Sequence, residues 1–174
     1  MPSVLAVIVS LRLFNISSAP PSVIEQAQRT LMRIYAAIDV EIRWTDAPSS
    51  LLVIVRDDEP GDLRRASQPL LGAAIHTSNG SPVAYVFYRR TAEQADRYGS
   101  TPASILGCAM AHEVGHLLLP THDHARGGLM RAFWEYPEFQ RAANGRLRFS
   151  SDEGALIRSN VSREGEHGTG TSRR

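Results

Sequence analysis

The sequence of 174 residues predicts an α+β domain, and three observations support this class. Apolar residues repeat at helical period in two segments, 24–38 and 105–118. Five shorter segments either alternate apolar and polar residues or are continuously apolar, which is typical of β-strands. A third helical pattern follows a break at Gly145. The predicted order along the chain is therefore β-α-β-β-β-β-α, then a loop and a final helix.

Local signals set the expected bounds of the helices and strands. Ser22 and Glu25 have the spacing of a capping box, and the same pattern recurs at Ser150. Thr101 is the expected N-cap of the central helix, which Pro120 is expected to end. The expected strands cover residues 4–14, 40–45, 51–55, 72–76 and 83–89, and the expected helices cover residues 22–37, 102–119 and 150–160.

The remaining segments are interpreted from their composition. Residues 56–71 are charged and contain prolines, so we expect a loop there, and residues 89–99 form a polar lead into the central helix. Residues 163–174 are rich in Gly, Ser, Thr and Arg and show no periodicity. We therefore expect a single domain over residues 1–162 and a disordered tail over residues 163–174.

Charge and cysteine content exclude several classes of partner. The 19 Lys and Arg residues nearly balance the 18 Asp and Glu residues, so we expect no nucleic acid and no anionic membrane as partner. The apolar run at residues 4–9 lacks the basic flank of a secretion signal, so we interpret it as a strand. Export stays open, because the sequence as written fits the cytoplasm and a different start would allow secretion. The single Cys108 excludes an intramolecular disulfide and is expected to be a buried thiol.

Residues 112–116 read His-Glu-Val-Gly-His and carry the strongest functional signal in the chain. His112 and His116 are four residues apart, which places both imidazoles on one face of a helix, one turn apart. A zinc ion requires this spacing of two neutral nitrogen ligands. Glu113 lies next to the first histidine and can reach a metal-activated water without binding the metal, so it is the expected general base.

Two further histidines and a methionine follow this helix, at His122, His124 and Met130. A helix with two histidine ligands, a break, a third histidine and a nearby methionine resembles the metzincin clan of zinc peptidases. The resemblance is specific only over residues 109–134. It implies a twisted mixed sheet backed by two long helices, with a zinc cleft beside an edge strand near residues 72–76 and a small C-terminal part that ends in a helix. It also implies that Met130 supports the ligands without binding the metal.

The third ligand has two candidates. His122 is in register with the third histidine of the metzincin pattern H-E-x-x-H-x-x-G-x-x-H, but Leu119 replaces the glycine of that pattern. Pro120 favours an extended Leu119, so we expect the chain to leave the helix by a different route. The segment also resembles uncharacterised bacterial metzincin-like proteins with H-E-[IL]-G-H-L-L-L followed by H-S-x-x-G-[IL]-M-R-A-x-W. That resemblance places the ligand at His124, which we favour, with His122 as the alternative.

The resemblance implies a zinc-dependent metalloendopeptidase with one catalytic Zn²⁺. Glu113 would take the proton of the water that attacks the peptide carbonyl. The expected partner is a peptide or protein substrate, and we expect a monomer. Some metzincins stabilise the oxyanion with a tyrosine two residues after the methionine, but that position is Ala132 here. We expect Trp134 to lie in the core, and Arg131 and Tyr136 to have surface or packing roles.

Two other functions remain as alternatives. In a gluzincin, Glu135 or Glu138 would have to supply the third ligand. A non-catalytic zinc-binding protein with a metzincin-like fold is the second alternative. The presence of Glu113 argues against it, because a purely structural site needs only ligands. Glu113 also argues against a bacterial family of zinc endoribonucleases, whose three-histidine motif lacks this glutamate.

Overall fold

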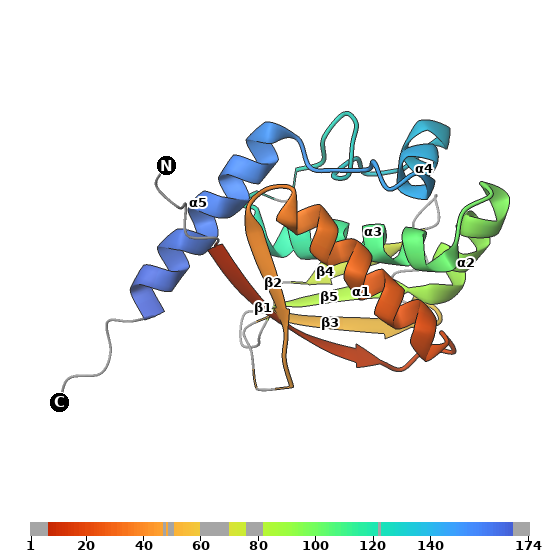
Figure 1. Cartoon of the computed structure of the whole chain (residues 1–174), viewed down its shortest axis with the longest axis horizontal. Coiled ribbons are helices and arrows are strands. Elements are labelled where there is room, and N and C mark those ends of the chain that lie inside the picture. Colours follow the sequence, from red (N-terminus) through yellow and green to blue (C-terminus); the bar gives the residue numbers. More distant parts are fainter. Residues whose placement is uncertain are drawn as a thin grey trace.

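A computed structural model describes residues 7–46, 48, 51–59, 70–75, 82–121 and 123–168, the last five of these by their backbone alone. The elements are β1 (Val7–Asn15), α1 (Pro21–Ala36), β2 (Val40–Trp44), β3 (Leu51–Arg56), β4 (Gly72–Ile75), β5 (Val83–Phe87), α2 (Tyr88–Arg97), α3 (Pro102–Leu118), α4 (Tyr136–Ala143) and α5 (Ser151–Gly168). This mixture of one sheet and several helices is compatible with the predicted α+β class (Figure 1).

The five strands form one mixed sheet in the order β2-β1-β3-β5-β4. Strands β1, β2, β3 and β5 pair in parallel, whereas β4 pairs with β5 in the antiparallel direction. The continuously apolar β3 lies in the middle of the sheet, as its sequence predicted. Strand β4 lies at the edge, as expected for residues 72–76, although residue 76 is outside the described part of the chain.

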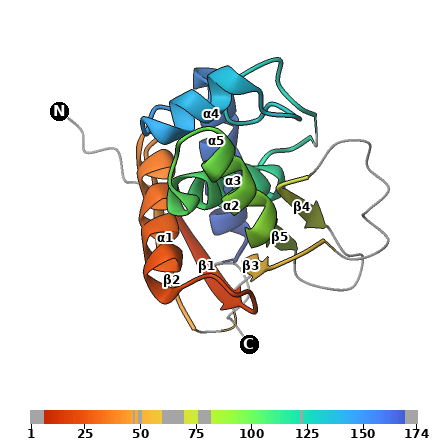
Figure 2. The same ribbon diagram turned by 90° about the vertical axis from the view of Figure 1, so that its right-hand side faces the viewer.

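Helices α1 and α3 lie side by side on the same face of the sheet (Figures 1 and 2). The apolar stripe of α1 supplies buried residues at helical spacing, including Leu31 and Ile34. In α3, 14 of the 17 residues are buried, because the sheet, α1, α2 and α4 all contact this helix. The predicted central helix therefore crosses the core. The buried polar side chains on it are packed against the sheet and the surrounding helices.

Capping explains where these helices begin and end. The Thr101 side chain accepts a hydrogen bond from the backbone N–H of Ser104 at 3.2 Å, and Leu119 ends α3 in an extended conformation (φ −81°, ψ 147°). Both features confirm the sequence predictions, as does a reciprocal capping box at Ser150. The capping box predicted at Ser22 is wrong, because Pro21 has a φ preset for the first helical position and α1 begins there.

Two helices and the end of a third differ from expectation. Helix α2 is polar and buries only Thr91 and Ala95, so it has no apolar period that a sequence pattern could show. Helix α4 has eight residues and was not predicted either. The tail predicted to be disordered from residue 163 is partly helical, because the backbone of α5 continues to Gly168 and extending a formed helix costs little. No helix in the described ranges has the length and apolar character needed to cross a membrane.

Candidate metal centre

Three imidazoles converge at the C-terminal half of α3. The Nε2 atoms of His112 and His116 are 3.0 Å apart, and the Nε2 atom of His124 is 3.1 Å from that of His116. The structure thus brings the favoured third histidine to the pair on the helix, and the three side chains could together hold a metal ion. His122, the alternative ligand, lies outside the described residues.

A closed turn after α3 places His124 beside the helix. The extended end of α3 at Leu119 leads the chain away, and the Ala125 backbone N–H then donates to the Met130 carbonyl at 2.9 Å. The Leu129 backbone N–H donates to the Arg148 carbonyl at 3.0 Å, which fastens the same turn to the segment before α5. His124 is exposed, whereas His112 and His116 are buried, so access to the cluster is from the side of His124.

The second ring nitrogen of His112 fixes the orientation of its imidazole. Nδ1 of His112 is 2.7 Å from the Leu129 carbonyl oxygen. A carbonyl only accepts, so Nδ1 carries the proton and Nε2 keeps its lone pair for a metal. Burial lowers the pKa of His112 to about 4, although the Leu129 hydrogen bond opposes this effect. The ring is therefore neutral at neutral pH, as a metal ligand must be.

Met130 packs against the turn of α3 that carries the two histidines. Its side chain is fully buried. A Cβ atom at Gly115 would lie 2.8 Å from Met130 Sδ and 3.0 Å from a ring carbon of Phe149, so only glycine allows this approach. The methionine thus packs from the core side against the turn of the helix that carries His112 and His116.

Glu113 lies between α3 and the edge strand. Its side chain passes so close to β4 that a Cβ atom at Gly72 would be 2.5 Å from Glu113 Cγ. The carboxylate accepts a hydrogen bond from the Ala74 backbone N–H. Burial raises the pKa of Glu113 to about 8, and the hydrogen bond from Ala74 acts in the opposite direction. In the metal-free protein the buried carboxyl group therefore keeps its proton to a higher pH than an exposed glutamate does.

A cleft of about 690 Å³ opens over the histidines and Glu113. One wall is the segment from Leu70 to Ala74, which includes most of β4. The opposite wall is aromatic, with Tyr98 stacked on Phe139 at a ring distance of 4.2 Å. Trp134 belongs to this wall as well; it is half-buried and packs against the hydrophobic core, so its predicted place in the core is confirmed in part.

The acidic residues of α4 contact arginines and do not approach the histidines. Glu138 is buried and pairs with Arg131 at 2.9 Å and with Arg141 at 3.3 Å. Glu135 pairs with Arg131 at 2.9 Å and caps α4. Neither glutamate belongs to the histidine cluster, which counts against the gluzincin alternative. Tyr136 is exposed, as expected, whereas Arg131 is half-buried and joins the turn after Met130 to α4.

Sequence reasoning missed several main-chain features of this site. The Leu129 carbonyl and the Ala74 N–H hold His112 and Glu113, yet any residue can supply such groups, so no side-chain signal identifies them. Gly72 carried a signal, because a glycine inside a strand often marks a close approach of another group. His76, the last residue of the strand predicted over residues 72–76, lies outside the described residues. Cys108 is buried as expected, and burial raises the pKa of its thiol to about 12.

No protein-family model and no curated protein matches the chain. Among solved structures, a chain of the "GM1 bound form of the ECX AB5 holotoxin" aligns with 91% of this chain and 82% of its own length. The two are 10% identical in sequence and have a TM-score of 0.49. A similarity at this level carries no argument about the fold or the function of this chain.

Proposed function

We propose that the protein is a zinc-dependent metalloendopeptidase with a divergent metzincin-like site. The observation that carries this proposal is the convergence of three imidazole Nε2 atoms, at 3.0 and 3.1 Å, next to the buried carboxyl group of Glu113. Histidine ligands from a helix and from the turn after it, a supporting methionine and a cleft beside an edge strand agree with the metzincin resemblance of the sequence.

The donor set fits zinc. Zinc binds neutral imidazole nitrogens at about 2.0–2.1 Å in a tetrahedron, which places two such nitrogens about 3.3 Å apart. The two Nε2–Nε2 distances are close to this separation. Three protein ligands are the number found in catalytic zinc sites, whereas structural sites commonly have four. His112, His116 and His124 would hold the ion, with His122 as the alternative to His124.

The chain's own residues supply the remaining parts of peptide hydrolysis. When bound, zinc supplies Lewis-acid polarisation of a carbonyl and acidifies a water. Glu113 takes the proton of the attacking water and can pass it to the leaving amine. The Ala74 N–H and the close contact with Gly72 hold the carboxyl group in one orientation. The entropy cost of orienting it for the reaction is therefore smaller.

The edge strand offers main-chain groups to an extended substrate. In the antiparallel pair of β4 and β5, the Phe87 N–H donates to the Leu71 carbonyl, and hydrogen-bonded pairs alternate along such a ladder. The main-chain groups of Gly72 and Ala74 therefore face away from β5, beside the cleft. The Ala74 N–H is used by Glu113, so the carbonyls of Gly72 and Ala74 are the acceptors that a substrate peptide added as a strand would meet.

Comparison of Glu113→Ala with Glu93→Ala tests the proposal. Glu93 is an exposed glutamate of α2 outside the cleft, so its variant controls for the loss of one acidic side chain. We expect the zinc-loaded wild type and Glu93→Ala to cleave a denatured protein of mixed sequence, and Glu113→Ala to keep its zinc and lose cleavage at least about a hundredfold. Equal cleavage by all three proteins would contradict Glu113 as the general base. No cleavage by the zinc-loaded wild type would contradict a peptidase and leave the non-catalytic zinc-binding alternative.

A further inference from the structure

One backbone carbonyl accepts hydrogen bonds from both a candidate ligand and a tryptophan. The Leu129 carbonyl oxygen is 2.7 Å from His112 Nδ1 and 3.1 Å from Trp134 Nε1. Its two lone pairs are thus both used. The indole also packs edge-on against the imidazole of His112, with the ring centroids 6.1 Å apart. Trp134, which lines the cleft, therefore contacts both partners of the hydrogen bond that orients His112: the Leu129 carbonyl and the imidazole ring.

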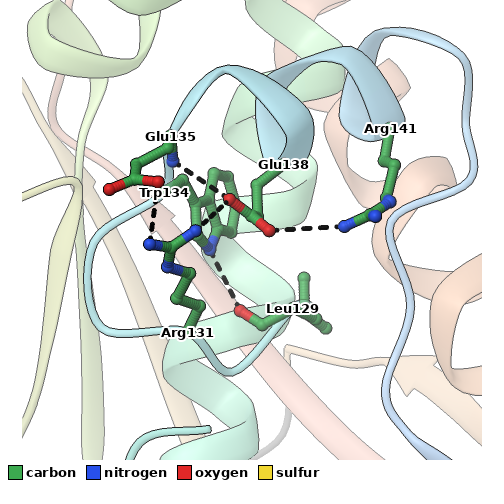
Figure 3. Close-up of polar contacts among 6 residues, drawn as sticks. All are labelled: Leu129, Arg131, Trp134, Glu135, Glu138 and Arg141. Atoms are coloured by element: carbon green, nitrogen blue, oxygen red, sulfur yellow. Dashed lines mark hydrogen bonds and ion pairs between the residues drawn. The ribbon is translucent and has the colours of Figure 1, made fainter. Parts of the chain in front are cut away.

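An ion pair between the half-buried Arg131 and the buried Glu138 holds Trp134 in this position. The Glu138 carboxylate accepts hydrogen bonds from the Glu135 backbone N–H at 3.1 Å and from Arg131 at 2.9 Å. Both contacts are drawn in Figure 3. Arg131 also pairs with the Glu135 side chain at 2.9 Å. Residues 131 and 135 are thereby joined on both sides of Trp134, and Arg141 occupies the second carboxylate oxygen of Glu138. The segment that carries the indole is closed into a short, ion-paired loop.

We propose that Trp134 is a positioning residue of the metal centre, which acts through the Leu129 carbonyl on His112 and is itself held by the Arg131–Glu138 pair. This inference rests on the proposed metal site. A second donor on the Leu129 carbonyl restrains the peptide plane that His112 contacts. The imidazole is then oriented before a metal binds, so the entropy cost of ordering this side chain on binding is smaller. Hydrogen bonds behind a ligand commonly change metal affinity by about 10- to 100-fold.

The two tryptophans of the chain provide a matched pair of variants. Trp134→Phe keeps an aromatic ring and removes the N–H that bonds Leu129. Trp44→Phe is the same substitution at the end of β2, at the sheet edge opposite β4, where Nε1 has no hydrogen-bond partner among the described residues. We expect the dissociation constant for Zn²⁺, measured by competition with a chromophoric chelator, to rise about tenfold in Trp134→Phe and less than about twofold in Trp44→Phe.

Two further readouts separate positioning from general destabilisation. In Trp44→Phe, Trp134 is the single tryptophan, and its emission should change when one equivalent of Zn²⁺ binds. In Trp134→Phe, the emission of Trp44 should stay constant. Glu138→Gln should weaken zinc binding severalfold, and the double variant with Trp134→Phe should bind no more weakly than Trp134→Phe alone, because both changes act through the same indole.

Each outcome decides between the site and the positioning role. Tight zinc binding that Trp134→Phe weakens no more than Trp44→Phe would overturn the positioning role and leave the metal centre intact. Fully additive losses in the double variant would overturn the link from Glu138 to Trp134. Failure of the wild type to bind Zn²⁺ would overturn the metal centre, and the positioning role with it.

Discussion

The replacement of Glu113 by glutamine should change how the stability of the metal-free protein depends on pH. Burial raises the pKa of Glu113 from 4.5 to about 8 in the folded protein. Between these values the folded protein keeps a proton that the unfolded chain has lost, so the stability of the wild type falls as pH rises. At about 1.4 kcal/mol per pH unit, this range sets a ceiling of about 5 kcal/mol. Glu113→Gln has no charge to bury and should escape this loss.

The free energy of unfolding, measured with urea in the presence of a chelator at pH 5 and pH 8.5, tests this prediction. We expect the two proteins to be nearly equally stable at pH 5, and Glu113→Gln to be more stable by several kcal/mol at pH 8.5. The lowered pKa of His112 has the opposite effect, because it makes stability rise with pH between about 4 and 6.5. This effect is the same in both proteins, so it cancels in the difference between their free energies of unfolding at each pH. Parallel pH profiles for the two proteins would refute the burial argument for Glu113.

Two glycine substitutions test the close contacts of the site, with Gly127→Ala as the control because a Cβ atom there meets nothing within 4 Å. Gly72→Ala puts a methyl group 2.5 Å from Glu113 Cγ and 2.5 Å from the Tyr85 carbonyl oxygen of β5, so both Glu113 and β4 must shift. We expect cleavage to fall at least about tenfold in a protein that still binds zinc. Unchanged cleavage would show that Glu113 does not depend on this approach. Gly115→Ala puts a methyl group 2.8 Å from Met130 Sδ and should lower the free energy of urea unfolding by about 1–3 kcal/mol. A loss no larger than that of Gly127→Ala would mean that Met130 moves aside freely.

The order of the elements could be predicted where the sequence alternates strongly. Strands β1, β2, β3 and β5 and helices α1 and α3 follow from their apolar patterns, because each buries one face or all of its surface, whereas β4 buries only Gly72. Helices α2 and α4 could not be predicted in this way, since α2 is polar and α4 is only eight residues long. Their positions depend on contacts with α3, which a local pattern does not contain.

In the candidate site, too, the sequence predicts the features that depend on local spacing and not those that depend on contacts between distant residues. The approach of His112 and His116 follows from helical spacing alone, and the extended Leu119 follows from the proline after it. The place of Trp134 was predicted only in part: its ring packs against the core, as an aromatic residue after an apolar segment usually does, but it also lines the cleft. Here the ion pair between Arg131 and Glu138 turns the segment toward the cleft. Such a pair links residues in a loop and a helix, so no periodicity indicates it.

Zinc content per chain, measured by elemental analysis for the wild type, His122→Ala and His124→Ala, tests the metal centre most directly. The convergence of His124 with the two histidines of α3 predicts about one zinc ion per chain in the wild type and in His122→Ala, and a large loss in His124→Ala. Loss in His122→Ala alone would restore the usual metzincin spacing and contradict the ligand proposed here. No zinc in the wild type, even after reconstitution, would contradict the metal centre itself.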